Sequence, residues 1–128
     1  MTAFDIAREK VIALQRLDTL DALARAYPFS AIATTRFQPV YPAMARQFVQ
    51  DSGVTRGVCV DVGGGAGWLA QAIARVSDLT VYVLDIDPTA VALGTLLARE
   101  AGLADRVRPV QGDATDMPFR DGFADLVV

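Results

Sequence analysis

Apolar residues in the first part of the chain recur at helical spacing. Over residues 3–25 they return every three to five positions, which places a single apolar stripe along a helix. Pro28 ends this helix, because the residue before a proline is pushed out of the α region. A second helix is predicted to begin at Pro42, since proline suits the first turn of a helix. We therefore expect residues 1–40 to form a helical segment ahead of a core domain at residues 41–128.

The second part of the chain alternates short apolar runs with helical stretches. The apolar runs are rich in β-branched residues and predict strands at 58–62, 80–84, 107–110 and 123–128. The stretches between the first three strands predict helices at 68–76 and 88–101. Strands separated by helices at this spacing are parallel and are joined by right-handed crossovers. The expected fold class is α/β, with a doubly wound, mainly parallel sheet preceded by N-terminal helices.

The amino-acid composition excludes several kinds of chemistry and says less about the fold. The chain has 128 residues, which suits one domain, and a net charge of −3, which disfavours a bulk electrostatic grip on nucleic acid. The absence of histidine excludes an imidazole base, and a single cysteine, Cys59, excludes a disulfide or a thiolate cluster. Asp5 and Glu9 stand where an export signal is basic and then apolar, and the most apolar tract contains Asp61. We therefore expect a cytoplasmic protein with no membrane span and no metal.

A glycine-rich loop at residues 61–67 lies between a predicted strand and a predicted helix. Glycine lets the backbone turn sharply and approach a ligand closely, and the start of the helix offers unpaired N–H groups. The nicotinamide pattern G-x-G-x-x-G fails from Gly63 but fits from Gly65, with the permitted alanine at Ala70. Asp85 follows Gly65 by 20 positions, where an acid can accept hydrogen bonds from ribose hydroxyls. Different nucleotide cofactors use such an acid, so this loop alone leaves the cofactor open.

Four segments in a fixed order make the reading more specific. They are D-x-G-x-G-x-G at residues 61–67, LDIDP at 84–88, VQGDATDMPF at 110–119 and DGFADLVV at 121–128. Over residues 40–128 the chain resembles the class I S-adenosylmethionine (SAM)-dependent methyltransferases, which have a Rossmann-like fold. The resemblance implies that the chain holds SAM and that its methyl group passes to an acceptor, which the sequence does not identify. It implies cofactor contacts from Asp61, Gly63, Gly65, Gly67, Asp85, Ile86, Asp113 and Ala114.

The same resemblance gives each of these residues a part of the cofactor. The three glycines line the methionine portion, and Asp61 lies near its amino group. Asp85 holds the ribose and Ile86 lies against the adenine, whose amino group and ring edge meet Asp113 and Ala114. Three aspartates at one edge of the sheet suit the sulfonium and the ammonium of SAM better than a pyrophosphate. No catalytic residue follows from the sequence, and a general base, if one is used, is not a histidine.

Alternatives stay open for the activity and for the completeness of the sheet. An NAD(P)-dependent oxidoreductase is supported only by the glycine spacing, and it lacks the GDA segment at residues 112–114. The family has seven strands whereas four are expected here, so we predict an incomplete sheet. It belongs either to a fragment of a longer enzyme or to a non-catalytic SAM-binding subunit that a partner completes. The bare edge of the fourth strand is expected to pair with a second copy or a partner chain, and the acceptor is expected to be a small molecule.

Aromatic residues precede the predicted core at Tyr27, Phe29, Phe37 and Tyr41. Related enzymes often have a lid over the cofactor at this place, so residues 1–40 are a candidate lid. Ordinary core packing explains the same aromatics equally well. Cys59 lies in the middle of a strand and is predicted to be a small buried hydrophobe rather than a nucleophile.

Overall fold

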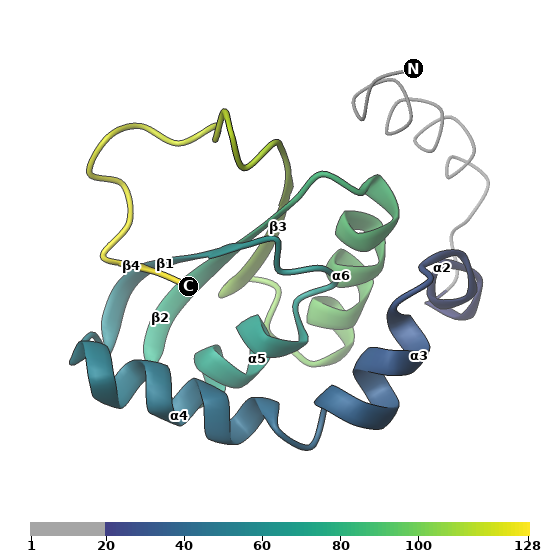
Figure 1. Ribbon diagram of the computed structural model, residues 1–128, viewed down its shortest axis with the longest axis horizontal. Helices are drawn as coiled ribbons and strands as arrows, with labels where there is room; N and C mark the ends of the chain where they lie inside the picture. Colours follow the sequence, from purple (N-terminus) through teal and green to yellow (C-terminus); the bar gives the residue numbers. More distant parts are fainter. Residues whose placement is uncertain (1–19) are drawn as a thin grey trace.

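The computed structural model of the chain describes residues 20–128 and contains one parallel sheet (Figure 1). Its strands are β1 Arg56–Val62, β2 Asp78–Asp85, β3 Val107–Gln111 and β4 Leu126–Val127. They lie in the order β3-β2-β1-β4, and each neighbouring pair is parallel. In the register, Cys59 lies between Val81 of β2 and Leu126 of β4. The predicted α/β fold with a parallel sheet is confirmed.

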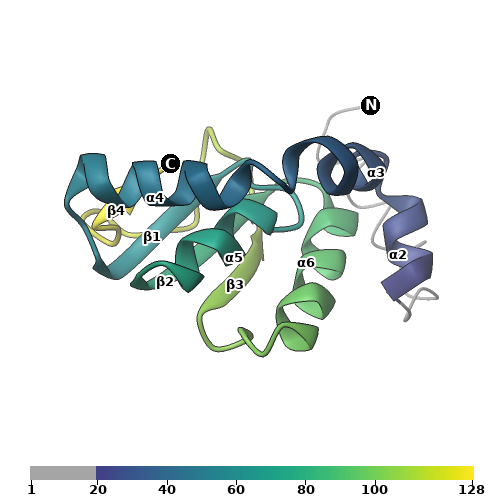
Figure 2. The same ribbon diagram turned by 90° about the horizontal axis from the view of Figure 1, so that it is seen from below.

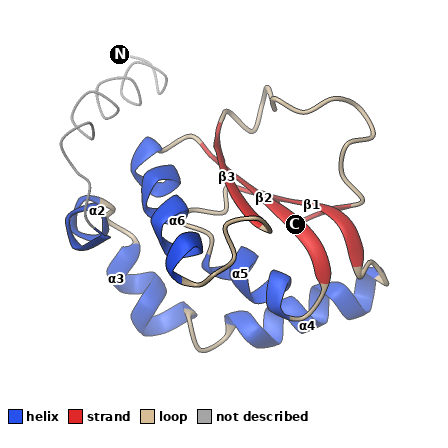
Figure 3. Ribbon diagram, turned by 180° about the vertical axis from the view of Figure 1, so that it is seen from behind, coloured by secondary structure: helices blue, strands red, loops and turns tan. Residues whose placement is uncertain are grey.

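Three helices cover one face of this sheet, as the view from below shows (Figure 2). They are α4 Tyr41–Ser52, α5 Trp68–Arg75 and α6 Pro88–Glu100. The sequence predicted the start of α6 correctly: the Asp87 side chain accepts a hydrogen bond from the Thr89 N–H at 2.9 Å, and Pro88 occupies the first turn. A strand-and-helix colouring shows the same layering from behind (Figure 3).

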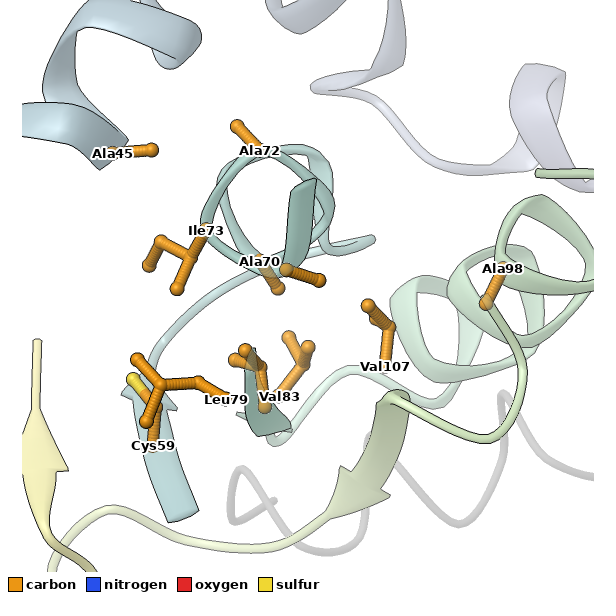
Figure 4. Close-up of a cluster of buried hydrophobic side chains, with 11 residues drawn as sticks. Ala45, Cys59, Ala70, Ala72, Ile73, Leu79, Val83, Ala98 and Val107 are labelled. Atoms are coloured by element: carbon orange, nitrogen blue, oxygen red, sulfur yellow. The ribbon is translucent and has the colours of Figure 1, made fainter. Parts of the chain in front are cut away.

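The core lies between the sheet and α5 (Figure 4). Alternate residues of the central strands point into it, among them Cys59 and Val83, and they meet Ala70 and Ile73 of α5. Small side chains on the inner face of α5 let the helix axis lie close to the sheet. Cys59 is fully buried, and burial, followed by the charge of Asp61, raises the pKa of its thiol to about 12. The prediction of a buried, unreactive cysteine is confirmed.

The N-terminal helices differ from the expectation in two ways. Of the helix predicted at residues 3–25, residues 1–19 lie outside the described part, and the remainder belongs to α2 Leu20–Ala26. Between residues 29 and 41, where no element is predicted, the chain forms a short α3 Ser30–Ile32 and a π-helical turn η1 Ala33–Phe37. The helix α2 packs against α6.

The fourth strand is shorter than predicted, because Phe123 does not enter the sheet. Its ring lies 5.0 Å from that of Tyr82 and 5.0 Å from that of Phe119, on the face of the sheet opposite α5. The carboxylate of Asp125 accepts a hydrogen bond from the Val58 N–H at 2.9 Å, so a side chain occupies the edge of β1 ahead of the strand. The backbone N–H of Asp125 donates to the carbonyl oxygen of Val58 at 2.8 Å, and the paired strand β4 follows at the next residue.

Candidate functional site

The glycine-rich loop joins the carboxyl end of β1 to the start of α5. Gly63, Gly65 and Gly67 have φ angles of 67°, 61° and 87°, in the left-handed region that other residues rarely adopt. The Gly63 and Gly64 N–H groups donate to the carbonyl oxygen of Leu84 at 2.8 and 3.2 Å, which ties the loop to the end of β2. The sequence therefore uses glycine here to make a tight connection at the carboxyl edge of the sheet.

Gly64 is a site residue that the sequence analysis missed. A methyl group placed on Gly64 lies 2.5 Å from Asp61 Oδ2 and 2.6 Å from a methyl carbon of Val83, which leaves no room for any side chain. The sequence does carry a signal for this position: residue 64 is a glycine although the D-x-G-x-G-x-G pattern accepts any residue there. Its absent side chain is what lets the carboxylate of Asp61 lie against the loop.

Asp85 fixes the loop from the end of the neighbouring strand. Its Oδ2 accepts a hydrogen bond from the Gly65 N–H and its Oδ1 accepts one from the Asp87 N–H, both at 2.9 Å. Each carboxylate oxygen has capacity for a second hydrogen bond. The arrangement therefore holds the loop and the turn before α6 in place and still leaves acceptors for the hydroxyl groups of a ligand.

Asp61 is buried at the end of β1, with 4% of its surface exposed. Its Oδ2 has no hydrogen-bond partner in the structure, which is rare for a buried carboxylate oxygen. Burial, and in second place the charge of Asp85, raises the pKa of Asp61 to about 7 from its ordinary value of 3.8. This acid is thus placed to receive a cationic or hydrogen-bond-donating group.

Asp113 has the opposite environment at the end of β3. Its Oδ1 accepts hydrogen bonds from the N–H of Thr115 at 2.8 Å and from the Thr115 hydroxyl at 2.7 Å, and the side chain is exposed. These bonds stabilise the ionised form and lower the pKa of the Asp113 carboxyl. Asp113 is therefore charged wherever the protein is folded near neutral pH.

The structure brings most of the predicted cofactor residues to one cavity. The cavity has a volume of about 200 Å³ and is lined by Gly63, Leu84, Asp85, Ile86, Gly112, Asp113 and Ala114. Five of the eight predicted residues are among them. Asp61 and Gly65 lie beside the cavity, in the strand end and the loop that border it, and Gly67 begins α5 and faces Val83 and Val107 in the core. A missed lining residue, Gly112, leaves no room for a side chain against Leu84.

The N-terminal aromatics divide into two pairs. Tyr27 is buried: its hydroxyl lies 2.8 Å from a methyl group placed on Gly65, and its ring stacks on Trp68 at 6.2 Å. Burial, followed by the charges of Asp85 and Asp87, raises the pKa of Tyr27 to about 12. Tyr41 has a pKa raised by burial and then by Asp61. Phe29 and Phe37 are exposed, and their rings contact those of Tyr27 and Tyr41 at 5.8 and 6.5 Å.

Comparison with known proteins identifies this arrangement. Residues 60–128, from the buried end of β1 to the last strand, match the family described as Methyltransferase domain. The chain belongs to that family. The match decides between the nucleotide-binding classes that the glycine spacing left open, and it confirms the resemblance found in the four sequence segments. The Rossmann-like fold class is confirmed with it.

Individual relatives agree with the family and are longer than this chain. A probable tocopherol O-methyltransferase of the chloroplast from Oryza sativa is 40% identical over 68 residues, 53% of this chain and 19% of that protein. The ubiquinone/menaquinone biosynthesis C-methyltransferase UbiE of Idiomarina loihiensis is 38% identical over 85 residues, 64% of this chain and 34% of that protein. A Methanococcus maripaludis structure, described as a candidate S-adenosyl-L-methionine-dependent methyltransferase, superposes with a TM-score of 0.74 at 31% identity and covers 84% of this chain and 48% of that one. The chain thus spans less than half the length of each of these proteins.

One further observation concerns membranes. Within residues 20–128 no helix is both long enough and apolar enough to cross a bilayer.

Proposed function

We propose that this chain binds SAM and forms the cofactor-binding part of a SAM-dependent methyltransferase. The observation that carries the proposal is the pairing of a buried, unpartnered carboxylate oxygen on Asp61 with a glycine loop that Asp85 holds in place. SAM carries a sulfonium and an ammonium and no phosphate, so it suits a site whose charged lining residues are aspartates. The family and the Methanococcus relative support this cofactor.

The roles of the site residues follow from where they lie. The two oxygens of Asp85 retain capacity to accept the ribose hydroxyls, and Ile86 offers an apolar surface to the adenine next to it. Asp113 and Ala114 line the same cavity, where Asp113 offers a polar contact and Ala114 an apolar contact to the adenine base. Gly63, Gly65 and Gly67 give the methionine portion close access to the backbone, and Asp61 receives its ammonium.

Bound SAM supplies an activated methyl group. This chain's residues bind and orient the cofactor, so that an acceptor can approach the methyl group in line with the bond that breaks. None of the described residues is assigned as a general base. The part of the reaction proposed for this chain is therefore positioning, with the electrostatic field of the aspartates favouring the cationic cofactor.

We propose a small molecule as the acceptor. The rice and Idiomarina relatives are named for small molecules, tocopherol and ubiquinone/menaquinone. The exposed rings of Phe29 and Phe37 lie on the N-terminal segment, next in sequence to the two tyrosines near the loop. That segment, residues 1–40, is proposed as the lid over a core at residues 41–128. The packing of Tyr27 against Gly65 and Trp68 supports this division.

A second proposal concerns the outer edge of β4. No described strand pairs with that edge, and Val127 has 58% of its surface exposed. We propose that a further strand adds there, supplied by the rest of a longer protein, by a second copy or by a partner chain. In the last case this chain is a SAM-binding subunit whose catalytic residues lie elsewhere. Location in the cytoplasm stays a prediction, which fractionation of cells that produce the protein tests.

Calorimetric titration of the purified chain with SAM and, separately, with NADH tests the cofactor. We expect SAM to bind, and Asp85→Ala to weaken binding at least tenfold because both the ribose acceptors and the loop anchor are lost. Asp78→Ala is the matched control: it removes an exposed acid from the opposite end of the same strand and leaves the affinity unchanged. A folded chain that binds neither ligand contradicts the proposal, and binding of NADH alone replaces it with an oxidoreductase.

A further inference from the structure

The surroundings of the buried oxygen of Asp61 bear on whether this carboxyl group is protonated. The Oδ2 atom is enclosed, and no residue between 20 and 128 donates a hydrogen bond to it. The backbone of Gly64 and the side chain of Val83 pack around the same place, as the lack of room for a methyl group on Gly64 shows. Such surroundings disfavour the ionised form of a carboxyl group, because Oδ2 is removed from bulk solvent and no residue of the described chain donates a hydrogen bond to it.

The titratable groups near Asp61 also disfavour the ionised form of its carboxyl group. The charge of Asp85, at the end of β2, acts on the pKa of Asp61 in the same direction as burial. Cys59, two residues earlier on β1, and Tyr41, on α4, are influenced by Asp61 in turn, and both have raised pKa values. The thiol and the phenol are therefore neutral near pH 7. Among residues 20–128 no cationic side chain offsets the charge of Asp61.

We propose that the ligand-free protein keeps a proton on the Asp61 carboxyl and that the ammonium group of the cofactor displaces this proton on binding. The inference rests on the proposed function, since it assumes that the methionine end of SAM reaches Asp61. The O–H bond of the carboxyl breaks, the proton passes to solvent, and the carboxylate accepts a hydrogen bond from the ammonium N–H. Cofactor binding is then coupled to the release of one proton and strengthens as the pH rises toward neutrality.

The size of the coupling follows from the pKa of about 7. At pH 6 the free protein holds about 0.9 proton on Asp61, and at pH 7.5 about 0.24. If the bound carboxylate is fully ionised, the affinity for SAM rises about eightfold between these pH values. The α-amino group of SAM, with an ordinary pKa of about 7.7–8.0, is almost fully protonated at pH 6 and roughly two-thirds protonated at pH 7.5, which reduces the net rise to about five- to sixfold. Any proton released at pH 6 therefore comes from the protein.

Calorimetry at pH 6 in buffers of different ionisation enthalpy measures this proton directly. Three ligands separate the parts of the cofactor: SAM, S-adenosylhomocysteine, which lacks the sulfonium but keeps the ammonium, and 5′-methylthioadenosine, which lacks the whole amino-acid end. We expect SAM and S-adenosylhomocysteine each to release about 0.9 proton and methylthioadenosine to release none. In Asp61→Asn, whose side chain cannot ionise, the release on SAM binding at pH 6 disappears and the affinity no longer rises between pH 6 and pH 7.5.

The outcomes distinguish this inference from the proposed function. Binding of SAM without proton release, or equal release with all three ligands, overturns the role of Asp61 and leaves the cofactor assignment standing. Failure of SAM to bind at either pH overturns both. If Asp61→Asn does not fold, the comparison of the three ligands on the unaltered chain still decides the matter.

Discussion

Asp61→Asn removes the titration of the buried carboxyl while keeping the shape of the side chain, and it changes how stability depends on pH in the absence of any ligand. In the folded protein the pKa of Asp61 is about 7, whereas in the unfolded chain it returns to the ordinary 3.8. Between these values the folded state holds the proton and the unfolded state does not. Rising pH therefore favours unfolding, and the loss of stability is complete once the pH exceeds the folded pKa.

The magnitude follows from the difference between the two pKa values. Each pH unit between them lowers the free energy of unfolding by about 1.4 kcal/mol, and the whole interval amounts to about 4 kcal/mol. Between pH 5.5 and pH 7.5 the expected loss from Asp61 is about 2 kcal/mol, because the slope flattens near the folded pKa. The asparagine variant lacks this loss, so its advantage over the unaltered chain grows by the same amount over that range.

Urea unfolding followed by the fluorescence of Trp68, the single tryptophan, measures this difference at the two pH values. Asp113→Asn is the control, because it removes an exposed carboxyl group whose pKa is shifted in the opposite direction. Its pKa is lowered by Thr115, so its contribution to stability is present above the ordinary pKa and is lost as the pH falls through the folded value. Parallel curves for the unaltered chain and Asp61→Asn between pH 5.5 and 7.5 would falsify the protonated Asp61, and the proton-release inference with it.

Four further substitutions test the packing of the loop and the cap of α6. Gly64→Ala is expected to lower the free energy of unfolding by about 1–3 kcal/mol, since its methyl group meets Asp61 Oδ2 at 2.5 Å; an unchanged urea midpoint contradicts this crowding. Gly65→Ala is strained by its φ of 61° and by the hydroxyl of Tyr27, so Tyr27→Phe should relieve part of the penalty. A double-mutant cycle should then show a coupling of about 1 kcal/mol, and additive effects exclude the contact. Asp87→Ala removes the hydrogen bond that begins α6 and should destabilise the protein by about 1 kcal/mol in urea unfolding, whereas an unchanged midpoint assigns no stability to the cap.

The sequence predicted the features that depend on local patterns. Apolar runs separated by helical stretches indicated three of the four strands to within two residues at each end, because a strand buried on both faces is nearly all apolar. The glycine loop was recognisable because three of its residues need a left-handed backbone that glycine adopts most easily. The cap at Asp87 was recognisable because a cap bonds to a residue only two positions away.

The features that the sequence did not predict depend on contacts between distant segments. The run of residues 123–128 has the composition of a strand, yet Phe123 packs on Tyr82 and Asp125 bonds to Val58, 67 positions earlier in the chain. Neither partner can be read from the neighbourhood of the run itself. The same holds for Tyr27, for which lid and core were equal alternatives. Its contacts with the loop and with Trp68 appear only once α2 is packed against α6.

For Asp61, the sequence predicts the place in the site but not the protonation state. Through the resemblance to the SAM-dependent methyltransferases, its place in the D-x-G-x-G-x-G pattern predicts that it lies near the amino group of the cofactor. Its protonation state depends on burial, on the missing side chain of Gly64 and on the charge of Asp85 from another strand. A family resemblance can therefore propose a ligand for a carboxyl group, whereas the charge of that group depends on contacts between distant segments of the chain.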